Sequence, residues 1–242
     1  MARSYGGRGR EERPRVRIED DGETRTLVVD ETFASFYRPG EVATYCVWDA
    51  IAAPILWLPP ARRRKILILG LGGGSIARLA RALAPKAQIL GVELDADVVR
   101  LARKHLELDV LGIDVEVTDA LGWLYAHAKD RTRYDVILED IFVGVGDEVH
   151  KPDWIPEPAH HLAVGMLARG GVLVSNTLDE HARVAKAMHE SFEDVIAIET
   201  EGYDNQVLAA SHGGLTGAEL RARVGKSDVL AESLPILSFR TR

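Results

Sequence analysis

Apolar and polar residues follow one another in a regular order along most of the chain. Short runs of consecutive apolar residues recur, and segments with apolar residues at helical spacing lie between them. Consecutive apolar residues are typical of strands buried on both faces of a parallel sheet. The pattern therefore predicts seven strands, at residues 66–69, 88–92, 115–117, 134–138, 172–175, 195–198 and 206–210. Helices are expected from Ser75 onward and over 96–106, 121–128, 156–167 and 180–189.

This alternation is typical of α/β proteins in which helices cover both faces of a parallel sheet. We therefore predict a doubly wound, Rossmann-like sheet of seven mostly parallel strands, with the last two strands antiparallel at one edge. Two short strand-like runs before it flank Asp20-Asp21-Gly22, which is typical turn chemistry for a small β-hairpin. Residues 41–58 have helical spacing and are followed by Pro59-Pro60, so a helix is expected there.

The chain is predicted to consist of three parts. Residues 1–15 are rich in Arg and Gly and lack the apolar centre of a secretion signal, so they are expected to form a basic, mobile tail. Residues 16–60 contain the hairpin and the helix, and residues 61–242 form the main domain. With 242 residues, 46% hydrophobic and 28% charged, the composition is ordinary for one α/β domain with a small appendage.

Charge and cysteine content argue against several classes of protein. A net charge of -7 argues against general nucleic-acid binding, which needs a basic face to displace phosphate counterions. The chain has no run of about 18 apolar residues, so no membrane span is expected. Cys46 is the only cysteine, so a disulfide within the chain is impossible and a reducing, cytoplasmic location is predicted.

A glycine-rich segment follows the first strand of the expected sheet. Gly70, Gly72 and Gly74 allow the backbone to turn tightly against a ligand before the next helix begins. Glu93 lies at the end of the next strand, about 20 residues further on, where an acidic side chain can hold ribose hydroxyls. The order of strand, loop, helix, strand and acid predicts a nucleotide-cofactor site. Glu93 alone does not distinguish S-adenosyl-L-methionine (AdoMet) from NAD.

Acidic residues also end the third and fourth strands. Asp119 and Ala120 follow the third, and Glu139 and Asp140 follow the fourth. Because neighbouring residues in a strand point to opposite faces, only one of Glu139 and Asp140 is expected to face a pocket, and Asp140 is the first choice for a base. Segment 141–154 carries glycines, acids and a proline, which favours an active-site lid.

Two aromatic residues are candidates for an acceptor pocket. Tyr45 and Trp48 lie three residues apart on the expected N-terminal helix, so both could line one wall of it. Aromatic residues at this spacing also occur in protein cores. His160 and His161 have no acid or cysteine at metal-ligand spacing, so no metal site is expected.

Taken together, these motifs resemble those of the spermidine synthases and their relatives among the class I AdoMet-dependent transferases. The resemblance covers about residues 16–210. It implies that the glycine loop approaches the methionine part of the cofactor and that Glu93 holds both ribose hydroxyls. It also implies that Asp119-Ala120 meets the adenine amino group, that Asp140 lies beside the reacting centre, and that the chain forms a homodimer.

Three departures from that family concern acidic positions. Its first loop generally reads Gly-Gly-Gly-Asp-Gly, with an Asp that binds the ammonium of decarboxylated AdoMet, and Gly73 stands in its place. The second Asp of the family's gate motif is replaced by Val143, and its Tyr-His-Glu trio corresponds at best to Tyr45-Cys46-Val47. Because polyamine binding needs carboxylates to offset desolvation of ammonium groups, these losses argue against polyamine synthesis.

The main expectation is therefore methyl transfer from AdoMet to a small-molecule acceptor. A neutral loop would leave backbone N–H groups and the positive end of a helix to face the carboxylate of intact AdoMet. Aminopropyl transfer from decarboxylated AdoMet to a polyamine is one alternative, and a non-catalytic AdoMet-binding module is another. An NAD-linked oxidoreductase is less favoured, because an acid like Asp119 after the third strand has no standard role in dinucleotide binding.

Overall fold

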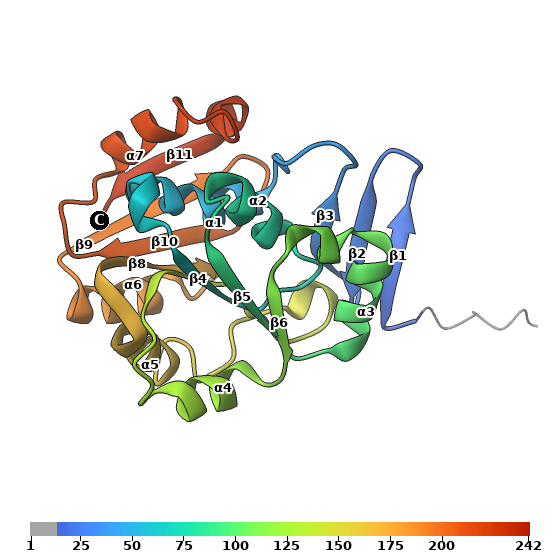
Figure 1. Cartoon of the computed structure of the whole chain (residues 1–242), viewed down its shortest axis with the longest axis horizontal. Coiled ribbons are helices and arrows are strands. Elements are labelled where there is room, and N and C mark those ends of the chain that lie inside the picture. Colours follow the sequence, from blue (N-terminus) through green and yellow to red (C-terminus); the bar gives the residue numbers. More distant parts are fainter. Residues whose placement is uncertain (1–13) are drawn as a thin grey trace, which may run out of the picture.

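The computed structural model describes residues 14–242 (Figure 1). The predicted basic tail therefore lies outside the described residues except for its last two. Arg15 is among the described residues and forms ion pairs with Asp30 and Asp95. Within residues 14–242, no helix combines the length and apolar character needed to cross a membrane.

A large mixed sheet of eight strands forms the centre of the structure, in the order β11-β9-β10-β8-β7-β4-β5-β6. The five strands from β8 to β6 are parallel, and β10, β9 and β11 extend the sheet in antiparallel fashion. Its strands are β4 (Lys65–Leu69), β5 (Gln88–Glu93), β6 (Asp114–Val117), β7 (Tyr134–Glu139), β8 (Leu167–Thr177), β9 (Asp194–Thr200), β10 (Gln206–Ser211) and β11 (Leu237–Thr241).

Helices cover both faces of this sheet, as predicted for a doubly wound fold (Figure 1). Alternate residues of β4 supply the two cores: Ile66 and Ile68 face one, and Leu67 and Leu69 face the other. The first core includes α1 (Val47–Ala52), α2 (Ser75–Leu83), α3 (Ala96–His105) and α7 (Gly217–Val224). The second includes α4 (Ala120–His127), α5 (Ala159–Met166) and α6 (His181–Ser191).

The eighth strand was not among the predicted strands. β11 pairs with β9 from Leu237 opposite Thr200 to Thr241 opposite Ile196. Its sequence, Leu-Ser-Phe-Arg-Thr, alternates apolar and polar residues because it is an edge strand with one solvated face. A search for continuous apolar runs therefore misses it.

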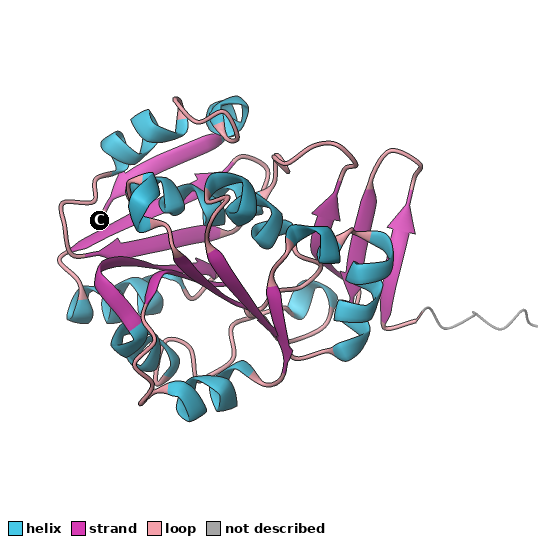
Figure 2. Cartoon of the chain, viewed as in Figure 1, coloured by secondary structure: helices cyan, strands magenta, loops and turns pink. Residues whose placement is uncertain are grey.

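The N-terminal appendage is a three-stranded antiparallel sheet rather than a hairpin. β1 (Val16–Asp20) and β2 (Arg25–Val29) form the predicted hairpin, and β3 (Thr32–Tyr37) adds a third strand. Figure 2 shows these strands apart from the large sheet, and α3 packs against β1 and β2. As described below, β3 brings this sheet against the glycine loop.

The helix expected over 41–58 is much shorter. α1 spans only Val47–Ala52 and continues as a 3-10 helix, η1, over Ala53–Trp57. Tyr45 lies before the helix with a positive φ of 53°, and Pro54 lacks the N–H that a continuing α-helix would use. The expectation that Tyr45 and Trp48 share one helical face is therefore wrong.

Candidate functional site

The predicted site residues gather at the carboxyl edge of the parallel strands. The glycine loop follows β4, Glu93 ends β5, and Asp140 follows β7. Gly70 lies so close to the end of β7 that a Cβ there would be 2.5 Å from the carbonyl oxygen of Asp140. With its φ of 82° as well, this position requires glycine. The close approach brings the cofactor loop and Asp140 together.

The loop N–H groups are not all left for a ligand. Gly72 N donates to Glu93 Oε2 at 2.8 Å, and Gly73 N donates to Ser35 Oγ at 2.6 Å. Gly74 N donates to the carbonyl oxygen of Leu71 at 3.1 Å. The expectation that a neutral loop presents its amides to the carboxylate of AdoMet is therefore wrong for these three residues.

Strand β3 closes one side of the glycine loop. Ser75, the first residue of α2, uses its hydroxyl to bind both the N–H and the carbonyl of Phe36 at 2.9 Å. At Gly73, a Cβ would lie 2.7 Å from Ser35 Cβ and 2.5 Å from Leu106 Cδ1. The position that carries an acid in aminopropyltransferases therefore has no room for a side chain here.

Glu93 lies where a ribose-binding acid is expected. Its carboxylate accepts from Gly72 N and from Asp95 N at 3.1 Å, and burial raises its pKa while these hydrogen bonds oppose the rise. The next residue, Leu94, has 70% of its surface exposed and offers an apolar contact beside the carboxylate. A partly buried acid next to an exposed apolar side chain fits an adenosyl group, which has ribose hydroxyls beside an apolar ring.

Asp119 begins α4 and caps it. Its Oδ2 accepts from Gly122 N at 2.7 Å, while Ala120 is buried in the second core. Asp119 itself is exposed, and β6, which precedes it, pairs with β5 so that Val117 lies opposite Glu93. The acid is therefore next to the Glu93 strand end, and part of its hydrogen-bonding capacity serves the helix.

Asp140 is held by two uncharged donors from distant elements. Trp48 Nε1 donates to its Oδ2 at 3.2 Å, and Asn176 Nδ2 donates to its Oδ1 at 2.8 Å. Burial raises the pKa of Asp140, and the charge of Lys151 and these donors oppose the rise. A carboxylate with a raised pKa is suited to accept a proton. Glu139 makes a separate set of buried contacts, as strand alternation predicts.

The two aromatic candidates lie in different surroundings. Trp48 is buried, contacts Asp140 and packs edge-on against Phe33, with 4.9 Å between ring centres. Tyr45 is 37% exposed, and its hydroxyl donates to Glu232 at 2.8 Å. The structure therefore brings Trp48 to Asp140, but gives Tyr45 no such contact.

Segment 141–154 forms a short hairpin over this edge. Val143 and His150 pair through two backbone hydrogen bonds of 2.9 Å, and Gly146 N at the tip donates to the carbonyl of Asp30 at 2.9 Å. Trp154 packs against the second core, at the end of the segment. The predicted lid is thus in contact with the N-terminal sheet at its tip.

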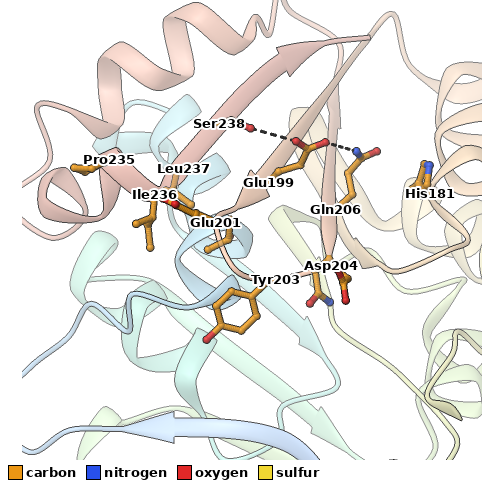
Figure 3. A pocket seen from close by; sticks show the side chains of 12 residues that line it. His181, Glu199, Glu201, Tyr203, Asp204, Gln206, Pro235, Ile236, Leu237 and Ser238 are labelled. Atoms are coloured by element: carbon orange, nitrogen blue, oxygen red, sulfur yellow. Dashed lines mark hydrogen bonds between the residues drawn. The ribbon is translucent and has the colours of Figure 1, made fainter. Parts of the chain in front are cut away.

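An acidic cavity of about 430 Å³ lies at the same edge, where β9, β10 and β11 meet (Figure 3). Glu201 and Asp204 line it and are exposed, while Glu199 is bound by Arg240 and by Gln206 at 2.7 Å. Asn205, also in its lining, donates to Asn176 at 3.1 Å. Since Asn176 binds Asp140, a continuous hydrogen-bonded path joins the cavity to that carboxylate.

Several residues of this site were not singled out from the sequence. Asn176 follows the predicted strand 172–175 within β8, and its polar character next to a buried run was the available signal. Lys151 is fully buried in the lid segment, where a lysine is ordinarily solvated, so nothing local marks it. Within residues 14–242, no group of three His, Cys, Asp or Glu side chains is placed to hold a metal ion.

No protein-family model matches the chain. A probable polyamine aminopropyl transferase of Bifidobacterium longum is 29% identical over 150 residues, which are 61% of this chain and 31% of that protein. The polyamine aminopropyltransferase of Chromobacterium violaceum is 29% identical over 209 residues, which are 84% of this chain and 74% of the relative. The chain thus matches less than a third of the length of the first relative and nearly three quarters of the second.

Solved structures share the fold. A probable spermidine synthase from Corynebacterium glutamicum has a TM-score of 0.71 at 22% identity, covering 93% of this chain and 86% of its own. Human methyltransferase-like protein 13 in complex with SAH has a TM-score of 0.59 at 21% identity, covering 78% and 90%. The resemblance predicted from the motifs is confirmed: the chain is similar in sequence to polyamine aminopropyltransferases, and it has the fold that the probable spermidine synthase and the methyltransferase-like protein share.

Proposed function

We propose that this protein is a transferase that uses an AdoMet-type sulfonium donor and a positively charged amine acceptor. Aminopropyl transfer from decarboxylated AdoMet to a polyamine is the first candidate. The observation that carries the proposal is the acidic cavity that Asn205 and Asn176 join to Asp140, because exposed carboxylates compensate the desolvation of an ammonium group. The names of the sequence relatives support the same acceptor class and favour this alternative over methyl transfer.

The donor would lie over the glycine loop, with Glu93 on its ribose and Leu94 beside its adenine. Asp119 adds a second acid at the neighbouring strand end, and Gly70 keeps the loop close to the end of β7. When bound, the donor would supply an alkyl carbon activated by positively charged sulfur, and the carbon–sulfur bond would break to leave a neutral thioether as the new carbon–nitrogen bond forms. The chain's task is then mainly to align the acceptor with that carbon.

Asp140 would serve as the base. An amine must be neutral to act as a nucleophile, and it carries a surplus proton once its new carbon–nitrogen bond has formed. The carboxylate of Asp140 takes up that proton, and Trp48 and Asn176 fix its orientation. The acceptor's remote ammonium group would lie near Glu201 and Asp204, in the cavity that Asn205 and Asn176 join to Asp140.

Methyl transfer from intact AdoMet is the second candidate. Gly73 and Val143 leave the site without two acids that aminopropyltransferases carry, and this favours a donor that keeps its own carboxylate. Both candidates share the acceptor cavity and the role of Asp140. They differ in the donor.

Calorimetric titration with AdoMet and with decarboxylated AdoMet in parallel tests the proposal. Tighter binding of decarboxylated AdoMet, with consumption of a diamine or polyamine, is the expected result. Tighter binding of AdoMet together with methylation of an amine would favour the second candidate. Binding of neither donor, or turnover of only neutral acceptors, would contradict the proposed function.

A further inference from the structure

A fully buried lysine contacts both chain neighbours of the proposed base. The side chain of Lys151 has 0% of its surface exposed, although it belongs to the lid segment. Its Nζ lies 2.6 Å from Glu139 Oε1 and 2.9 Å from the carbonyl oxygen of Ile141, and 4.0 Å from the centre of the Phe142 ring. Burial of an ammonium group is costly unless its charge and N–H groups are compensated, and here they are.

Glu139 is the counter-charge. It is buried beneath the sheet edge and also accepts from Ser175 Oγ at 2.5 Å and from Ile141 N at 2.7 Å. Burial alone would raise its pKa, but the charge of Lys151 and the contact with His160, 3.7 Å away, outweigh burial and lower the pKa to about 2. Glu139 is therefore a structural anion that holds the lysine, separate from the acceptor cavity.

These contacts fasten the chain on both sides of Asp140. Glu139 precedes Asp140 and Ile141 follows it, and one ammonium group binds both. The backbone N–H of Lys151 also donates to Glu180 Oε1 at 2.7 Å, at the start of α6. The base of the lid hairpin is thus tied to β7 and α6, while its tip is tied to the N-terminal sheet.

We propose that Lys151 is a positioning residue that holds Asp140 in place for proton transfer. From the base of the lid, it binds both chain neighbours of Asp140, Glu139 and Ile141. This inference rests on the proposed function, because it assigns Lys151 to the same reaction. Lys151 itself touches neither the acceptor cavity nor the glycine loop in the contacts described above.

Because Lys151 is charged, this role has a measurable effect on the pKa of Asp140. The charged groups that act on Asp140 are Lys151 on the lid and Glu139 on β7, and its partners from α1 and β8, Trp48 and Asn176, are uncharged. Lys151 opposes the rise that burial causes in the pKa of Asp140. Replacement of Lys151 by a neutral residue should therefore raise that pKa further and move its titration to higher pH.

The test compares Lys151→Met with the parent and with Lys186→Met, which removes an exposed lysine of α6. Hydrogen exchange of the amides of 141–154 and NMR titration of the Asp140 carboxyl, assigned with Asp140→Asn, are measured together with turnover. In Lys151→Met we expect faster exchange, a higher Asp140 titration midpoint and a roughly 10- to 100-fold lower kcat, with donor affinity retained. Lys186→Met should match the parent in all three.

A second variant covers the case in which Lys151→Met leaves Glu139 unpaired and does not fold. Lys151→Met combined with Glu139→Gln removes both charges, and the exchange of 141–154 should remain faster than in the parent because the bond to the Ile141 carbonyl is lost. Parent-like exchange in both variants, or an unshifted Asp140 titration in the single variant, would overturn the proposal. Absence of amine turnover by the parent would instead contradict the proposed function, and the two physical measurements would still decide whether Lys151 holds Asp140.

Discussion

At the residue scale, two neighbouring carboxylates have opposite properties because their partners differ. Glu139 has an ammonium partner and a lowered pKa, whereas Asp140 has two uncharged donors and a raised one. Strand alternation predicted that only one of them faces the pocket. It gave no information about their partners, because Lys151 lies in a loop and Asn176 lies on another strand, β8.

Glu93 provides a test of the cofactor assignment at this scale. Glu93→Gln keeps the size of the side chain but removes the charge that would accept from ribose hydroxyls. Because hydrogen bonds to charged groups contribute roughly 1.5–3 kcal/mol, donor affinity should fall about 10- to 100-fold in calorimetric titration. Glu23→Gln, in the exposed β1–β2 turn, is the matched control and should bind like the parent. Equal affinity of the two variants would show that Glu93 does not hold the donor.

At the scale of elements, the sequence predicts the parallel strands well and the edges poorly. Continuous apolar runs identify β4 and β7 because both of their faces are buried. β3 and β11 each have one partly solvated face and carry polar residues, so the same criterion misses them. The consequence for the site is large, because β3 supplies the Ser35 hydroxyl that binds the glycine loop.

The contact between β3 and the glycine loop predicts the effect of a single methyl group. Gly73→Ala should lower the free energy of unfolding by about 1–3 kcal/mol, because its Cβ would collide with Ser35 and Leu106 in a packed region. Gly165→Ala is the control: the position is an exposed site in α5 with nothing within 4 Å of the added Cβ, so a gain of roughly 0.5–1 kcal/mol is expected. Urea unfolding measures both. If Gly73→Ala left the free energy of unfolding unchanged, β3 would not be packed tightly against the glycine loop.

At the scale of the whole molecule, the site is assembled from three parts of the chain. The N-terminal sheet contributes Ser35, the parallel strands contribute Glu93 and Asp140, and the antiparallel strands contribute the acidic cavity. The sequence predicted the middle part, because strand ends of a parallel sheet share one edge. The sequence offers segment 203–206 as a part that could reach an acceptor but favours a turn there, since it does not show that β11 packs beside this segment and completes the acidic cavity.

The buried Glu139–Lys151 pair should make the whole fold sensitive to acid. The pKa of Glu139 is lowered in the folded state from 4.5 to about 2, so its contribution to stability is present above pH 4.5 and is lost as the pH falls toward 2. Urea unfolding of the parent between pH 6 and pH 3 should show a steeper loss of stability than the variant with both Lys151→Met and Glu139→Gln. Glu23→Gln should follow the parent. Parallel curves for the parent and the double variant would contradict this assignment.

The packing of Ser35 against Gly73 also constrains how this protein can change over evolutionary time. An acidic side chain at Gly73 could not be accommodated by that substitution alone, because Ser35 and Leu106 already fill the space. The three positions are therefore epistatic: an acid at Gly73 becomes acceptable only after other substitutions have moved Ser35 and Leu106 away from the loop. Under the proposed function, donor preference would change together with the packing of the N-terminal sheet against the glycine loop, and relatives with an acid at this position are expected to differ in that packing.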